Sequence, residues 1–156
     1  MSQGEARIDL ETSVGYLLKE AASALRTSME TVLRPLGMNI THYSCLELLA
    51  QRPGLSNSEL ARGAFVSRQS MNVLLHSLEE DGFVSRAREA PEGRARPTEL
   101  TESGRIRLAA ASAAVRGVED RMRSGLSSTE QEQLRAHLAA CVVSLAGPDR
   151  ARGDSS

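Results

Sequence analysis

The sequence predicts a mainly α-helical chain with one small β-hairpin, an α+β fold in a single domain of residues 1–156. Apolar residues recur at helical spacing over most of this length. Two short segments in the middle of the chain each begin with a serine in the N-cap position of a helix. Between two helical stretches, residues 83–100 alternate as strands do on both sides of a Pro-Glu-Gly turn.

The two ends of the chain are predicted to form long amphipathic helices. From Val14 to Leu36 the apolar side chains follow helical spacing, and this helix is expected to end at residues 35–37. A long stripe of small residues starts at Thr101, and residues 126–130 supply a cap for one more helix. These helices carry more apolar surface than a small domain can cover. They therefore pack either within one chain or between two copies of it.

Three short helices are predicted in the middle of the chain. The first follows an N-cap at Thr41 and ends at a Pro-Gly pair. The second begins at Ser56, where Glu59 stands in capping-box register. The third begins at Ser67 and ends at the Asp-Gly pair of residues 81–82. Because only a tight turn separates the last two, they are predicted to form a helix-turn-helix.

A basic β-hairpin is predicted directly after the helix-turn-helix. One strand starts at Phe83 and the other returns through Thr98 and Leu100, with Pro97 on a free edge because it has no N–H for the ladder. The formal net charge of the whole chain is only −1, so the positive charge of the hairpin is a local feature. Residues 41–101 therefore form a winged helix-turn-helix, whose hairpin carries Arg86, Arg88, Arg94 and Arg96.

Two short motifs in the hairpin identify a family. Glu92-Gly93-Arg94 is followed by Leu100-Thr101-Glu102-Ser103-Gly104. With the order of elements, they resemble the MarR (multiple antibiotic resistance regulator) family, in which Asp-x-Arg precedes Leu-Thr-x-x-Gly, so Glu stands here in place of Asp. The resemblance implies a transcriptional repressor that binds a palindromic operator in double-stranded DNA as a homodimer. It also implies that residues 12–37 and 103–146 are dimerisation helices.

The second helix of the helix-turn-helix is predicted to lie in the major groove. Gln69 and Asn72 carry amides that pair with adenine, and Arg68 suits guanine or phosphate. In the hairpin, Arg94 is expected to enter the minor groove, with Glu92 bracing it. The hairpin arginines Arg86, Arg88 and Arg96 either reach phosphates or pair with Glu89, Glu92 and Glu99. The other predicted DNA contacts are Ser56, Asn57, Ser67, Ser70 and His76.

The same resemblance implies that a small, often aromatic or phenolic, effector binds between the dimerisation helices and the winged region. The predicted lining of this effector site is Ser28, Met29, Val32, His42, Tyr43 and Leu46. Each of these residues also suits ordinary packing. Two alternatives stay open. One is a redox-sensing regulator acting through Cys45, although an apolar helix without an adjacent basic residue favours an inert thiol. The other is a winged-helix module that binds another protein and no DNA.

Other functional classes find no support in the sequence. His42, His76 and His137 are scattered, and no catalytic or nucleotide-binding motif appears, so we expect neither an enzyme nor a cofactor. The His and Cys positions lack the spacing of metal ligands. The apolar runs are far too short to span a membrane, and Cys45 and Cys141 suit reduced thiols. A cytoplasmic protein without a membrane partner is therefore expected.

Overall fold

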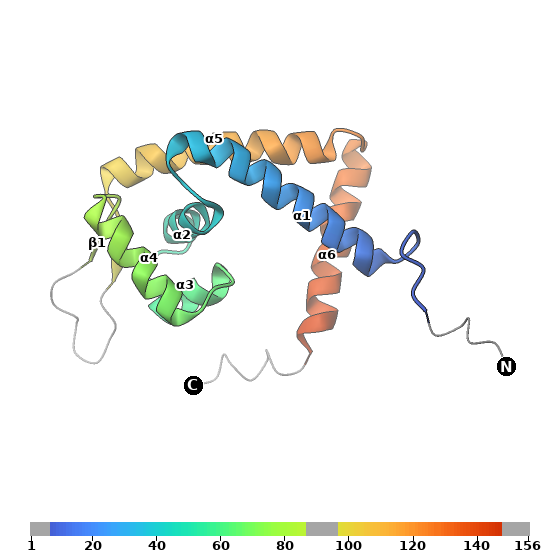
Figure 1. The fold of residues 1–156 in the computed structure, drawn as a ribbon, viewed down its shortest axis with the longest axis horizontal. Coiled ribbons are helices and arrows are strands. Elements are labelled where there is room, and N and C mark those ends of the chain that lie inside the picture. The colour runs from blue at the N-terminus through green and yellow to red at the C-terminus, as the bar shows by residue number, and fades with distance from the viewer. Residues whose placement is uncertain (1–6, 87–96, 148–156) are drawn as a thin grey trace. The chain divides into compact units, whose positions relative to one another are not determined.

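The computed structural model describes residues 7–86 and 97–147 of the chain (Figure 1). The chain divides into two compact units, Met1–Val118 and Glu119–Ser156. Within the described residues the fold is helical apart from one two-stranded antiparallel sheet, which confirms the predicted fold class. The elements are α1 (Val14–Leu33), a short 3-10 helix η1 (Arg34–Leu36), α2 (Ile40–Gln51), α3 (Asn57–Gly63), α4 (Arg68–Glu80), β1 (Val84–Arg86), β2 (Thr98–Leu100), α5 (Glu102–Arg123) and α6 (Ser128–Ala146).

Side-chain caps fix where most of the helices begin. Ser56 and Glu59 form the predicted capping box of α3, and the Ser67 side chain caps α4 as expected. The start predicted for α2 was wrong by two residues, because Asn39 and not Thr41 is the N-cap. The His42 N–H donates to Asn39 Oδ1 at 2.8 Å, and the Asn39 N–H donates to His42 Nδ1 at 3.3 Å. This reciprocal pair satisfies two N–H groups and places Thr41 inside the first turn.

The capping role of His42 makes the stability of the fold depend on pH. Burial lowers the pKa of His42 below 6.5, while the charge of Asp81 opposes this shift. The folded chain therefore favours neutral His42, whose Nδ1 accepts the Asn39 N–H. Its stabilising contribution is present above pH 6.5 and is lost as the pH falls through the lower pKa of the folded state. We expect His42→Gln to weaken the loss of stability on acidification, measured by urea unfolding at a series of pH values. An unchanged pH dependence would contradict this assignment.

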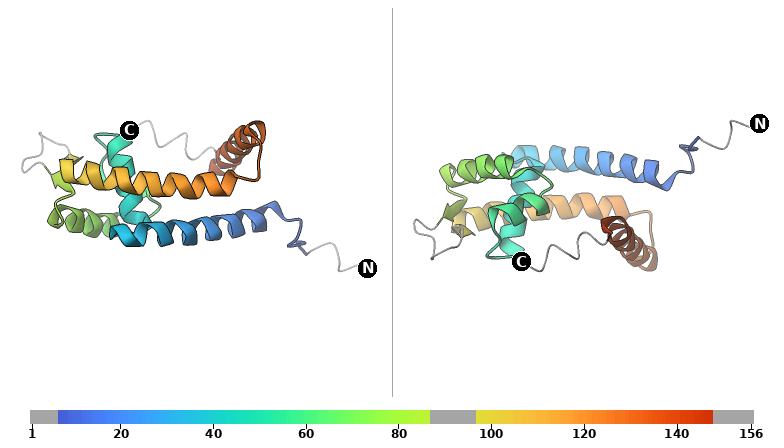
Figure 2. Two further views of the ribbon diagram at one scale, coloured as in Figure 1. Left: turned by 90° about the horizontal axis from the view of Figure 1, so that it is seen from above. Right: turned by 90° about the horizontal axis from the view of Figure 1, so that it is seen from below.

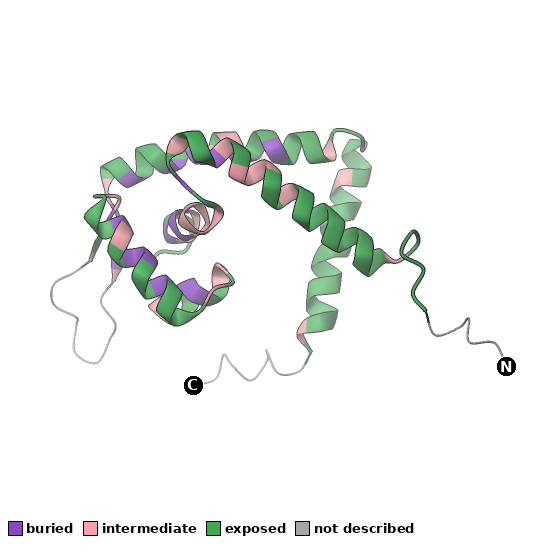
Figure 3. Cartoon of the chain, viewed as in Figure 1, coloured by how far each residue is buried: buried purple, intermediate pink, exposed green. Residues whose placement is uncertain are grey.

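The core of the first unit lies where α2, α3, α4 and the hairpin meet the end of α1 and the start of α5. Buried residues gather at this end, whereas the first half of α1 is exposed (Figure 3). Seen from above, α1 and the part of α5 in this unit run alongside each other, with α2 crossing between them (Figure 2). The largest side chains without solvent contact are Leu33, Cys45, Leu46, Leu60, Met71 and Leu75.

The second unit consists of the end of α5, a turn and α6. The sequence predicts a cap within residues 126–130, and in the structure Ser127 and Glu130 form a capping box at the start of α6. The Gln131 side chain donates to the carbonyl oxygens of Arg123 and Leu126 and so closes the turn between the two helices. No residue of α6 is buried. None of the helices that the structure describes has both the length and the apolar character needed to cross a membrane.

Candidate nucleic-acid interface

Helix α4 has two faces of opposite character. Met71, Leu74, Leu75 and Leu78 are buried against the core and fix the helix in place. The predicted DNA contacts on this helix all lie on its exposed surface: Arg68, Gln69, Ser70, Asn72 and His76. An α-helix that is firmly packed on one side and polar on the other has the diameter and the hydrogen-bonding groups to enter a major groove.

The N-terminus of α4 carries free backbone donors beside its cap. Ser67 Oγ accepts the Ser70 N–H at 3.1 Å and donates to Ser70 Oγ at 2.9 Å. Ser67 therefore acts first as a cap, as the sequence predicts. The N–H groups before Ser70 have no partner inside the helix, and the positive end of the helix dipole lies there too. This end of α4 suits a phosphate oxygen.

A hydrogen bond joins the two helices of the helix-turn-helix on their polar side. Asn57 Nδ2 donates to Asn72 Oδ1 at 2.7 Å, across the turn between α3 and α4. Asn57 is half-buried and Asn72 is exposed. The bond fixes the plane of the Asn72 amide and leaves its two N–H donors free toward solvent. Asn57 thus acts on the predicted surface by orienting Asn72.

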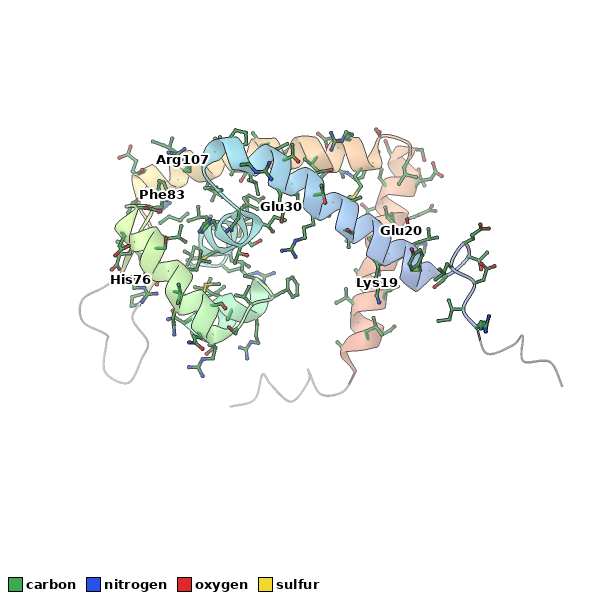
Figure 4. The ribbon with its side chains drawn as sticks, viewed as in Figure 1. Lys19, Glu20, Glu30, His76, Phe83 and Arg107 are labelled. Atoms are coloured by element: carbon green, nitrogen blue, oxygen red, sulfur yellow. The ribbon has the colours of Figure 1, made fainter. Side chains whose placement is uncertain are left out.

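The base of the hairpin is held by the Leu-Thr-x-x-Gly motif. Thr101 Oγ1 donates to the Gly82 carbonyl oxygen at 2.6 Å and accepts the Gly104 N–H at 3.0 Å. A Cβ atom on Gly104 would lie 2.0 Å from the Phe83 carbonyl oxygen, so only glycine fits. The Arg107 guanidinium stacks over the Phe83 ring, 5.4 Å from its centroid, near the start of α5 (Figure 4). The motif therefore locks α5 onto the turn between α4 and β1.

Arg86 is half-buried at the end of β1. The strands pair with Val84 opposite Leu100 and Arg86 opposite Thr98, so Arg86 shares the inner face with buried Val84. Arg86 Nε and Nη2 have no solvent contact and no hydrogen-bond partner among the described residues, and the same holds for Thr98 Oγ1. Two of its guanidinium nitrogens therefore face the protein, and a phosphate contact by Arg86 stays a prediction. Four other predicted wing residues fall outside the described residues: Arg88, Glu92, Arg94 and Arg96.

The six residues predicted to line an effector pocket belong to the region where α1 and α2 meet. Leu46 has no exposed surface and is a core residue in this conformation. Tyr43 lines a cavity of about 210 Å³ together with Glu47 and Gln51. The other four are half-buried: Ser28, Met29, Val32 and His42. Their role as effector contacts stays a prediction.

The environment of Cys45 does not suit a redox sensor. Its side chain is fully buried, with Sγ 3.8 Å from Met71 Sδ. Burial raises the pKa of the Cys45 thiol to about 12, although the nearby Arg86 acts in the opposite direction. The thiolate is the reactive form, so this thiol is inert in the folded chain. Among the described residues, no three His, Cys, Asp or Glu side chains come together as metal ligands would.

The sequence analysis did not single out two exposed apolar residues of the helix-turn-helix, one on α4 and one in the turn before it. Val73 is 67% exposed on the helix itself. Phe65, in the turn before α4, is 89% exposed and has a positive φ of 59°. The sequence does indicate that Val73 is exposed, because it lies four residues after Gln69 and outside the stripe of buried residues. Nothing in the local sequence marks Phe65, since this backbone conformation is unusual for an aromatic residue.

A capped helix-turn-helix followed by a two-stranded hairpin defines this chain as a winged helix-turn-helix protein. The family model for the MarR family matches residues 36–95. The chain is 38% identical over 128 residues to the HTH-type transcriptional repressor Rv2887 of Mycobacterium tuberculosis, which covers 82% of this chain and 92% of that protein. The chain therefore belongs to the MarR family of transcriptional regulators.

Two solved structures of Rv2887 share the fold. The structure in complex with DNA has a TM-score of 0.68 and 35% sequence identity, and covers 83% of this chain and 98% of that one. The structure in complex with salicylic acid has a TM-score of 0.70 and 37% identity, and covers 83% and 96%. The family predicted from the hairpin motifs is thereby confirmed.

Proposed function

We propose that this chain is a transcriptional repressor that binds a palindromic operator in double-stranded DNA and is released by a small aromatic effector. The observation that carries the proposal is the exposed polar face of α4, with the amides of Gln69 and Asn72 on a helix whose other side is buried. The relative Rv2887, solved with DNA, supports the same partner for this chain. DNA binding would place the protein in the cytoplasm, and this role requires no catalytic activity.

The proposed functional form is a homodimer. Helix α1 exposes Val14, Leu17 and Leu18 in its first half, where no residue is buried. Helix α6 has no buried residue, and its exposed apolar side chains are Leu134, Leu138, Val142, Val143 and Leu145. Such apolar surfaces favour association. A two-fold dimer would present two copies of α4 to the two halves of a palindrome.

The proposed effector is a small aromatic or phenolic molecule. Salicylic acid, the compound solved with Rv2887, is of this chemical class. The proposed contacts are the half-buried residues where α1 and α2 meet, while the cavity that Tyr43 lines is formed by α2 and the end of α3. Binding that favours the DNA-free conformation would lower the affinity for the operator by thermodynamic linkage.

The proposal is tested by measuring affinity for duplex DNA across a salt series. We expect the logarithm of the binding constant to fall linearly with the logarithm of the salt concentration, because bound cations release counterions from phosphates. Arg68→Ala and Arg94→Ala should each reduce this slope by about one for every phosphate that the arginine neutralises in the wild-type complex. Arg26→Ala is the matched control, since Arg26 is exposed on α1 and pairs with Glu30.

Two results would overturn the proposal. Affinity that does not respond to salt would favour a module that binds another protein. A chain that stays a single subunit in solution would exclude two-fold recognition of a palindrome.

A further inference from the structure

The exposed face of α4 has an aliphatic side chain at its centre. On the helix, Val73 projects opposite the buried side chains of Leu75 and Leu78, and it is 67% exposed. Gln69 lies one turn before it on the same ridge, and His76 lies close by, on the side of α4 turned away from α2 (Figure 4). Packing therefore does not explain a β-branched apolar residue at this position.

The polar neighbours of Val73 on both sides each make one contact within the chain. The Asn72 amide accepts from Asn57, and His76 Nε2 lies 3.3 Å from Glu80 Oε1. Among the described residues, no hydrogen bond holds the Gln69 side chain. Within the part of the chain that the structure describes, Gln69 and Val73 thus lie on this ridge without a side-chain partner.

We propose that Val73 reads a thymine in each half of the operator by contact with its C5-methyl group. On the major-groove edge of the base pairs, the methyl group of thymine is the apolar feature that an aliphatic side chain can recognise. Valine suits the contact because its χ1 angle is nearly fixed in a helix, so its methyl groups are held in place before binding. Gln69, one turn away, would pair with an adenine close to this thymine. The inference rests on the proposed function and adds a specificity-determining residue to it.

A protein partner fits this position less well than a base. A single valine between polar side chains offers far less apolar area than the patches that mark protein-binding sites. The polar ridge around it also supplies hydrogen-bonding groups of the kind that pair with base edges. The observations therefore favour the thymine methyl group.

The test compares thymine with uracil, which lacks only the methyl group. Operators are first recovered with the full-length wild-type protein from random duplexes. Each thymine is then replaced by deoxyuridine, one position per half-site at a time, and affinity is measured by fluorescence anisotropy. For the wild-type protein we expect one position where the replacement weakens binding about fourfold per methyl group. For Val73→Ala, thymine and uracil at this position should bind alike, while the effects at the other thymines stay as in wild type.

Ile8→Ala is the matched control, because Ile8 is 75% exposed but lies before α1, outside the residues assigned to DNA contact or dimerisation. It should keep the wild-type preference for thymine at every position. If Val73→Ala also keeps that preference while binding the operator, the inference is wrong and the proposed function stands. If the wild-type protein binds no duplex even at low salt, both fail. Thermal unfolding of each variant shows whether it is folded in the assay.

Discussion

Replacing Gly104 with alanine is expected to destabilise the fold by about 3 kcal/mol, the upper end of the range for overpacked sites. The new Cβ atom would lie 2.0 Å from the carbonyl oxygen of Phe83 and 3.0 Å from its carbonyl carbon. Because these are backbone atoms, no side-chain rotation relieves the clash. Moving the two segments apart would also stretch the hydrogen bonds that Thr101 makes to Gly82 and Gly104. Urea unfolding followed by circular dichroism measures the loss.

Gly117→Ala provides the control on the same helix. A Cβ atom at Gly117 meets no atom within 4 Å, so the substitution only improves helix propensity. We expect it to raise the free energy of unfolding by about 0.5–1 kcal/mol. If both alanine variants unfolded at the same urea concentration as wild type, the close contact between α5 and the turn before β1 would be refuted.

Truncating Leu75 to alanine is expected to cost about 2–5 kcal/mol of stability. Leu75 has no exposed surface and packs on the inner face of α4, so the change removes buried side-chain atoms and leaves a cavity. The measurement is again the free energy of unfolding in urea. Since α4 carries the predicted base contacts, affinity for the operator should fall with the folded fraction.

Val73→Ala is the comparison on the opposite face of the same helix. Its side chain is largely exposed, so stability should change by no more than about 0.5 kcal/mol. Leu75→Ala would contradict the described packing of α4 if its stability matched that of Val73→Ala. The two variants together separate the role of α4 in folding from its role in recognition.

Local sequence signals predicted the helices well where the cap and its partner lie within one turn. The pair Ser56 with Glu59 forms as expected, and the cap predicted within residues 126–130 is the pair Ser127 with Glu130. At α2 the prediction chose Thr41, because a histidine at N3 is not part of the usual pattern. There the neutral Nδ1 of His42 takes the role that a carboxylate or an amide oxygen normally has.

The hairpin shows that a charge count alone does not give the direction of a side chain. The arginines were predicted from their number and their turn, yet Arg86 has the same strand parity as buried Val84. The alternation alone carried this information. For Arg94, the charge argument still stands as a prediction.

Contacts between segments distant in the sequence were beyond prediction. The fit of Gly104 against Phe83 requires the return of the chain after the hairpin, and no local pattern encodes it. The hairpin motif predicted that this glycine matters through family resemblance, whereas the structure supplies the reason. The exposed position of Val73 needed only the helical period, and here the prediction overlooked a signal that the sequence carries.

The bond between Asn57 and Asn72 has a consequence for how operator preference evolves in such a protein. A replacement of Asn57 by a residue without a donor would release the plane of the Asn72 amide, so selection on the reading helix at position 72 also acts on position 57 in α3. Positions 57 and 72 should therefore covary between paralogues that have diverged to different binding sites.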